Sequence, residues 1–174
     1  MDIVENLEQW TAKFESTWLA HLRKTGERDF ANLYPSARNR HVEGVKGIDL
    51  SKSRLMFVSS AGGDLKDKQE PFNETDSEGD YSIRTFGNDI AFEQLDYAHF
   101  AYDKVDVRKD PNVLLPFDHL REMVDSGEIG ELAPTIVSFM GYQPHLGRLV
   151  EETIPPIIEI AKKEKVDGAL LVPS

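Results

Sequence analysis

The chain has 174 residues, of which 40% are hydrophobic and 29% charged, and its formal net charge at pH 7 is −11. Such a composition is typical of one globular domain with a sizeable core. The excess of negative charge disfavours binding to nucleic acids and to anionic membranes, whose phosphates need Lys and Arg. The chain contains no cysteine, which excludes disulfides, thiolate metal sites and a cysteine nucleophile within these residues.

No run approaches the ~20 apolar residues that span a membrane. The first residues, Met1-Asp-Ile-Val-Glu-Asn6, lack the basic start and apolar core of a signal peptide. We therefore expect a cytoplasmic protein.

The spacing of apolar residues predicts an amphipathic helix over residues 5–24. Its apolar stripe carries Leu7, Trp10, Phe14, Trp18, Leu19 and Leu22. Two interpretations of the two tryptophans are open: the stripe packs on its own domain, or it forms an interface between subunits. Residues 28–47 are polar and interrupted by Pro35. We therefore expect residues 1–47 to form an N-terminal helical arm and linker, and residues 48–174 to form an α/β domain.

Strands are predicted over residues 54–60, 81–86 and 97–102, with a long polar loop over 64–80. After the first strand comes Ser59-Ser-Ala-Gly-Gly63. Its hydroxyls and backbone N–H groups could bind an anion, but an ordinary glycine turn explains the sequence equally well. It matches neither a dinucleotide fingerprint nor a P-loop.

The second half alternates strands and helices, which indicates βαβ units and a parallel sheet. A helix is predicted over residues 117–126 with Gly127 as its stop, then a strand over 134–140. A helix over 147–165 follows, which Pro155 and Pro156 should break or kink. The apolar run 168–173 is typical of a buried parallel strand. The expected fold is therefore α/β, three-layered and Rossmann-like, with a mostly parallel sheet and an N-terminal helical extension.

Ligands of open α/β sheets bind beyond the carboxyl ends of the strands, and polar residues follow several of these strands. His99 and Asp103 flank Tyr102 and could do acid–base chemistry, although a structural histidine is the commoner explanation. Asp110-Pro-Asn112 is a turn signal. His119 and His145 are expected at the surface without a role, and no metal site is predicted. The predicted pocket is lined by Ser59, Ser60, Gly62, His99, Tyr102, Asp103, Asp110, Asn112, Ser138, Met140 and Gly141.

Eight segments occur in the order found in one known family. They are 54–62, 71–72, 79–84, 98–103, 110–123, 127–134, 138–142 and 166–173. Together, over about residues 53–174, the chain resembles the selenoprotein B component of glycine, sarcosine, betaine and D-proline reductases. The resemblance implies the substrate-binding part of a subunit that cleaves a C–N bond of an amino-acid-derived substrate reductively.

In that family a selenocysteine, or a cysteine in its place, follows the final strand and displaces the amine, and a partner subunit carries a pyruvoyl group. A selenolate suits this role because the ionised form is the nucleophile. The present chain ends before that motif, so we expect it to be inactive as given. Either the gene continues through a UGA codon read as selenocysteine, or the chain is a short relative that lost the chemistry.

Two functions follow as hypotheses. The first is the reductase subunit, with the other complex subunits and further copies of the chain as partners. The second is a non-catalytic binding or assembly protein that dimerises through the face carrying Trp10 and Trp18.

Overall fold

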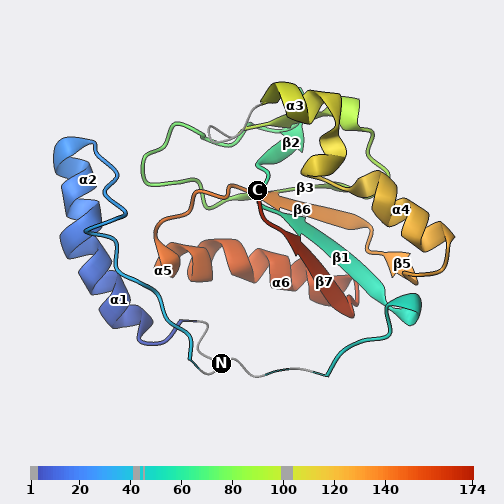
Figure 1. Cartoon of the computed structure of the whole chain (residues 1–174), viewed down its shortest axis with the longest axis horizontal. Coiled ribbons are helices and arrows are strands. Elements are labelled where there is room, and N and C mark those ends of the chain that lie inside the picture. The colour runs from blue at the N-terminus through green and yellow to red at the C-terminus, as the bar shows by residue number, and fades with distance from the viewer. Residues whose placement is uncertain (1–3, 41–43, 45, 99–103) are drawn as a thin grey trace.

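The computed structural model of the chain describes residues 4–40, 44, 46–98 and 104–174 (Figure 1). Its centre is a five-stranded mixed sheet. The strands are β1 (Arg54–Ser59), β3 (Ile83–Gly87), β5 (Glu131–Leu132), β6 (Thr135–Phe139) and β7 (Gly168–Val172). β1 pairs in parallel with β5, β6 and β7, whereas β3 joins the far side of β6 antiparallel. The predicted α/β class and mostly parallel sheet are confirmed.

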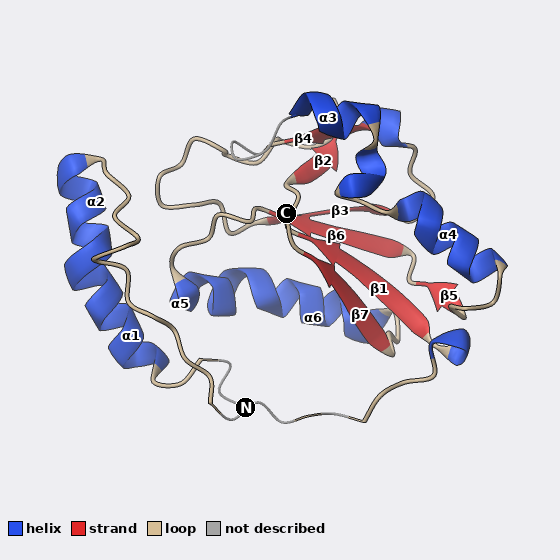
Figure 2. Cartoon of the chain, viewed as in Figure 1, coloured by secondary structure: helices blue, strands red, loops and turns tan. Residues whose placement is uncertain are grey.

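Helices cover both faces of this sheet (Figure 2). Because side chains alternate along a strand, Leu55 and Phe57 of β1 face one side, in the core that contains α4 (Phe117–Asp125). Met56 and Val58 face the other side, against α6 (Ile154–Lys163). The remaining short helices are α3 (Lys104–Lys109), η2 (Leu50–Lys52), η3 (Phe92–Gln94) and η4 (Pro111–Val113).

A second, two-stranded sheet lies beyond the carboxyl ends of β1 and β6. β2 (Gly63–Leu65) pairs antiparallel with β4 (Leu95–Tyr97). The sequence prediction missed β2, because the polar residues after Asp64 indicated a loop. It also placed the neighbouring strand over 97–102, whereas β4 ends at Tyr97; residues 99–103 lie outside the described part of the chain.

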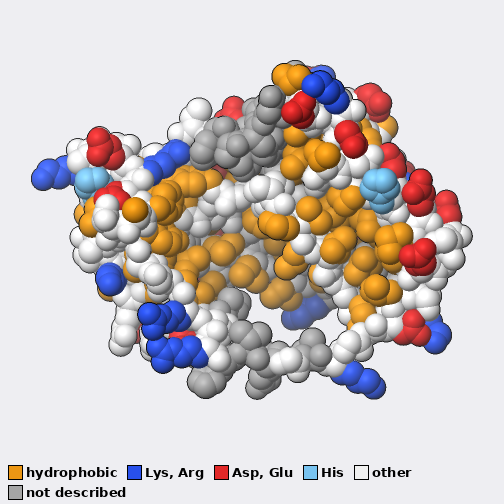
Figure 3. Space-filling model, viewed as in Figure 1, with side chains coloured by type: hydrophobic (Ala, Val, Ile, Leu, Met, Phe, Trp, Pro, Cys, Tyr) orange, Lys and Arg blue, Asp and Glu red, His pale blue; other side chains and the backbone are white. Residues whose placement is uncertain are grey.

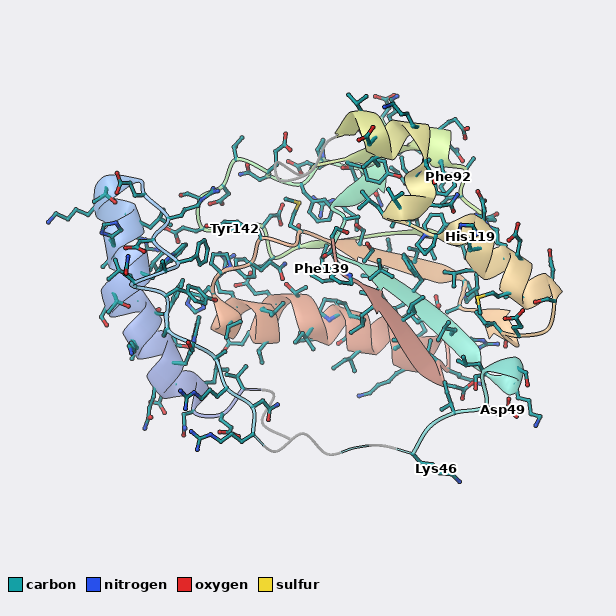
Figure 4. All side chains as sticks on the ribbon, in the orientation of Figure 1. Lys46, Asp49, Phe92, His119, Phe139 and Tyr142 are labelled. Atoms are coloured by element: carbon teal, nitrogen blue, oxygen red, sulfur yellow. The ribbon has the colours of Figure 1, made fainter. Side chains whose placement is uncertain are left out.

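The N-terminal helix forms as predicted, in three consecutive parts. These are α1 (Leu7–Phe14), the π-helical turn η1 (Glu15–Leu19) and α2 (Ala20–Thr25). Trp10 and Trp18 are only 6% and 0% exposed, because the apolar stripe packs against Tyr34, Tyr142 and Leu146 of the same chain. The stripe thus packs on its own chain, and its interpretation as a dimer interface is not favoured. Figure 4 shows Tyr142 on the side of the α/β domain that faces the N-terminal helix.

The predicted helix over 147–165 is not broken by its prolines. It runs through α5 (Leu146–Arg148), the π-helical turn η5 (Leu149–Thr153) and α6, and Pro155 and Pro156 lie in the first turn of α6. A proline is tolerated near a helix start because the first N–H groups have no partner within that helix. Where a break was expected, the helix instead adopts π-helical geometry in the turn just before the prolines.

Strand β7 is not the buried strand that the sequence predicted. Its described pairing is to β1 alone, so it forms an edge of the sheet, and Leu171 is 69% exposed. An apolar cavity of about 460 Å³ lies along it, lined in part by Leu50, Met123 and Leu170. Figure 3 shows hydrophobic side chains gathered over the flank that carries β7 and α4. An apolar run therefore does not by itself distinguish a central strand from an edge strand.

An exposed apolar edge favours association of chains. We expect Leu171→Lys to reduce concentration-dependent association in light scattering, while the free energy of unfolding changes by about 0.5 kcal/mol or less, as for other surface substitutions. Val113→Lys, at a side chain 61% exposed outside the strands, serves as the control. Equal association of the two variants would show that the β7 edge is not responsible.

Candidate functional site

Two serines lie side by side where β1 and β6 end. Ser59 and Ser138 are register partners in neighbouring parallel strands, and both are 0% exposed. The Gly63 N–H donates to Ser138 Oγ at 2.8 Å, and the Ala61 N–H donates to Ser59 Oγ at 3.2 Å. The turn after β1 is thus fastened to both hydroxyls.

A third serine, Ser60, follows directly after β1 and contacts the end of β7. The Ser60 N–H donates to the carbonyl of Val172 at 3.2 Å, and Ser60 Oγ accepts the N–H of Ser174 at 2.9 Å. The carboxyl end of β7 therefore lies directly against the residues that follow β1. Ser60 is 9% exposed.

All three hydroxyls act as hydrogen-bond acceptors here, each of a backbone N–H. A serine hydroxyl also carries one O–H donor. Within the described residues, none of the three O–H groups has a hydrogen-bond acceptor. Buried donors of this kind are usually satisfied, so the cluster presents O–H groups suited to an anionic ligand group.

Gly62 fixes the shape of the turn. Its φ is +63°, and a Cβ there would lie 2.5 Å from the Ala98 carbonyl oxygen and 2.7 Å from Met140 Sδ. Its N–H donates to the Phe139 carbonyl at 3.0 Å, and its carbonyl accepts from the Ala98 N–H at 2.9 Å. Only glycine combines this left-handed conformation with such close neighbours. Met140, 2% exposed, packs in the small core under the turn.

Asp64 is a buried carboxylate that the sequence prediction missed. It follows Gly63 in β2 and is only 2% exposed, and no described residue donates a hydrogen bond to its carboxyl group. Asp96 lies directly opposite in β4. Burial, reinforced by the negative charge of Asp96 and opposed by Arg84, raises the pKa of Asp64. An aspartate directly after a Gly-Gly turn at a strand end was the available signal, but it was counted as the start of a polar loop.

Arg84 is the cation whose charge acts on Asp64, but its guanidinium is already engaged. It donates to the carbonyls of Glu70, Ile83 and Pro71 and to Ser82 Oγ at 2.8–3.5 Å. It also lies 4.4 Å above the ring of Phe72. Arg84 therefore holds the loop after β2 in place and leaves the Asp64 carboxyl without an ion pair among the described residues.

The other predicted site residues do not join these serines in the described structure. The Asn112 N–H donates to Asp110 Oδ1 at 3.1 Å within their own turn. The Asn112 side chain also donates to Asp118 Oδ2 and accepts the N–H of Asp118 at the start of α4. Gly141 is exposed just beyond Met140. The prediction for His99, Tyr102 and Asp103 lies outside the described residues.

His119 and His145, both expected at the surface, differ from each other. His119 is an exposed side chain on α4, as predicted (Figure 4). His145 is not a plain surface residue, because its ring packs 5.0 Å from that of Phe14 and 6.4 Å from that of Trp10. Its Nδ1 accepts the Arg148 N–H at 3.3 Å and so begins α5. The aromatic surface that buries it comes from the distant N-terminal helix.

A large cavity of the described chain lies away from the serines. It has a volume of about 600 Å³ and lies between α1 and α5, lined by residues such as Thr11, His145 and Arg148. No set of three or more His, Asp or Glu that could hold a metal ion occurs in the part of the chain that the structure describes. None of its helices is long and apolar enough to cross a bilayer.

The raised pKa of Asp64 predicts a pH-dependent stability difference. A group whose pKa is higher in the folded state favours folding when protonated, so its favourable contribution is lost as pH rises through that pKa. We therefore expect Asp64→Asn to be more stable than wild type at neutral pH, and the difference to shrink as pH falls. Urea unfolding at several pH values measures this. A variant less stable than wild type at pH 7 would contradict it.

The fold and the cluster together define an α/β protein whose polar residues meet at the carboxyl edge of a mostly parallel sheet. Residues 18–173 match the family described as glycine/sarcosine/betaine reductase selenoprotein B. The chain belongs to this family, and the match reaches into the N-terminal helix.

Several curated relatives are reductase subunits. The chain is 36% identical over 124 residues to D-proline reductase subunit gamma of Acetoanaerobium sticklandii, covering 71% of this chain and 49% of the relative. It is 34% identical over 102 residues to sarcosine reductase complex component B subunit beta of Peptoclostridium acidaminophilum, covering 57% and 23%. A glycine reductase complex component B subunit gamma of the latter organism is 29% identical over 114 residues, covering 64% and 26%.

The chain thus spans about half the length of the first relative and about a quarter of the other two. No solved structure matches the chain significantly.

Proposed function

We propose that this chain is the substrate-binding part of a B-type subunit of an amino-acid reductase, which cleaves the C–N bond of an amino-acid-derived substrate reductively. The observation that carries the proposal is the presence of buried serine hydroxyls, whose O–H groups have no acceptor among the described residues, at the carboxyl edge of the sheet, in a chain that belongs to the selenoprotein B family. A Rossmann-like arrangement with an N-terminal extension is part of this proposal.

The chain's own residues would bind and orient the substrate. Ser59 and Ser138 are register partners, each receives a backbone N–H, and neither O–H has an acceptor among the described residues, so this pair suits the carboxylate of an amino acid. Hydrogen bonds to a charged acceptor are stronger than those between neutral groups.

The nucleophile would come from outside these residues. The sequence has no cysteine, so a selenocysteine or cysteine must be supplied by further polypeptide, and a pyruvoyl group by a partner subunit. When present, the selenolate or thiolate would supply the nucleophile for displacement of the amine. The carboxyl end of β7 lies against Ser60, so polypeptide that follows this strand would reach the cluster. The 174 residues alone would then be inactive.

The relatives' names support partners of the same kind. They are subunits of D-proline, sarcosine and glycine reductases, so we propose that this chain assembles with other reductase subunits in the cytoplasm, and also with copies of itself. A purely structural assembly role through the tryptophan face is not favoured, because Trp10 and Trp18 are buried within the chain.

The direct test restores the nucleophile. A form of the chain extended beyond residue 174 with a cysteine in the selenocysteine position is combined with the partner subunits and a dithiol reductant. We expect release of an amine from glycine, sarcosine or betaine, or opening of the ring of D-proline, for at least one of these four substrates. The 174 residues alone should give neither reaction. No reaction with any of the four substrates would contradict the proposal.

A further inference from the structure

A cavity beside α1 carries positive charge in a chain that is acidic overall. Its volume is about 450 Å³, and its cations are Lys13 of α1 and Arg38 and Arg40 of the segment that follows Pro35. Figure 3 shows Lys and Arg side chains gathered in this region, at the lower left of the view. Because the formal net charge of the chain is −11, three cations on one cavity mark a local preference for anions.

The chain's own acidic residues do not neutralise these cations. Within the part of the chain that the structure describes, no ion pair or side-chain hydrogen bond engages the Lys13, Arg38 or Arg40 side chain. Arg148, by contrast, holds Glu152 through two hydrogen bonds. Among the described residues that line the cavity, Glu5 is the one carboxylate, so the lining carries a formal charge of +2.

Hydrogen bonds fasten the arginine segment to the start of the N-terminal helix. The Trp10 Nε1–H donates to the Pro35 carbonyl at 2.9 Å, and the Glu5 N–H donates to the Arg38 carbonyl at 3.1 Å. Glu5 Oε1 in turn accepts the N–H of Arg40. The backbone that carries both guanidinium groups is thus held in place without a ligand, which lowers the entropy cost of binding one.

The donors on this cavity suit a compact group with two negative charges. Arginine presents a planar fork of N–H groups that fits phosphate or carboxylate oxygens, and lysine adds a point charge. Asn6, Gln9 and Ser36 line the same cavity and supply neutral donors. A phosphate monoester carries a charge of about −1.5 to −2 at pH 7 on one group, whereas a dicarboxylate divides its charge between two. The volume of 450 Å³ lies within the range of about 300–1,000 Å³ of small-molecule sites.

We propose that this cavity binds a phosphate dianion, either free or as the monoester of a small molecule. Arg38 and Arg40 donate to the phosphate oxygens, and Lys13 contributes the third positive charge. The site uses none of the serines where β1 and β6 end. Its failure and the failure of the proposed function are therefore distinguishable.

The experiment titrates the 174-residue chain with inorganic phosphate, glycerol phosphate and succinate as separate probes at constant ionic strength. NMR follows the Arg38 and Arg40 amides and the Trp10 indole N–H. We expect saturable shifts of these signals with at least one phosphate probe, weaker binding of succinate, and an unchanged Ser138 amide. The phosphate probe that binds more tightly identifies the free ion or the monoester as the ligand.

Arg38→Gln should weaken phosphate binding at least tenfold, because it removes hydrogen bonds assisted by charge. Arg38 is exposed, so the variant should fold as wild type does. Lys24→Gln is the matched control, since it removes one positive charge from the exposed end of α2, outside the cavity, and should bind as wild type does. Equal loss of affinity in the two variants would reduce the effect to overall charge and overturn the proposal. Shifts that do not saturate, or succinate binding as tight as that of phosphate, would overturn it as well.

Discussion

Trp18→Ala should lower the free energy of unfolding by about 3–5 kcal/mol, as expected when a large core aromatic residue is truncated. Trp18 is 0% exposed, and its ring stacks 5.3 Å from that of Phe14 and meets Tyr34 edge-on at 5.8 Å. Its Nε1–H has no hydrogen-bond partner in the described structure, so the loss is one of packing alone. Urea or thermal unfolding measures the effect.

Trp18→Phe is the matched control. It keeps an aromatic ring and removes the unpaired N–H, so we expect it to cost less than about 1.5 kcal/mol, as conservative core substitutions do. A loss below 1 kcal/mol for Trp18→Ala would mean that the N-terminal helix is not docked on the rest of the chain. The stripe would then again be available as an interface between subunits.

Gly62→Ala should have the largest effect at the candidate site itself. The left-handed conformation costs a residue with a Cβ about 1–2 kcal/mol, and overpacking typically costs about 1–3 kcal/mol more. The new Cβ would lie 2.5 Å from the Ala98 carbonyl oxygen and 2.7 Å from Met140 Sδ. We expect a total loss of stability of about 2–5 kcal/mol and displacement of the turn after β1.

Gly127→Ala separates the two contributions. Gly127 has a similar φ of +78°, but a Cβ there would meet no atom within 4 Å. Its substitution should therefore lower the free energy of unfolding by only about 1–2 kcal/mol, the cost of placing a residue with a Cβ in the left-handed conformation. If Gly62→Ala costs no more than Gly127→Ala in urea unfolding, the turn after β1 is not held as tightly as its contacts indicate.

Local pattern predicted the regular elements well. Periodic apolar residues placed the N-terminal helix and α4, and Gly127 indeed takes the positive φ that ends α4. Ser59 and Ser138 could be assigned to strand ends, and the structure makes them register partners. In these cases the signal lies within a few neighbouring residues.

The features that sequence reasoning missed depend on distant contacts. β7 has the composition of a central strand, but pairing to β1 alone makes it an edge. Asp64 lies in a polar sequence, and only its place in β2 buries it. His145 is enclosed by Phe14 and Trp10, more than 100 residues earlier in the chain. No local periodicity encodes such contacts.

The polar residues where β1 and β6 end are proposed to bind an amino-acid-derived substrate. Amide NMR of the wild-type chain titrated with sarcosine tests this proposal most directly. We predict that the largest shifts occur at Gly63 and Ser138, with the Trp10 and Trp18 indole signals unchanged. Unchanged Gly63 and Ser138 signals at saturating sarcosine, or shifts centred on the cavity between α1 and α5, would contradict the account.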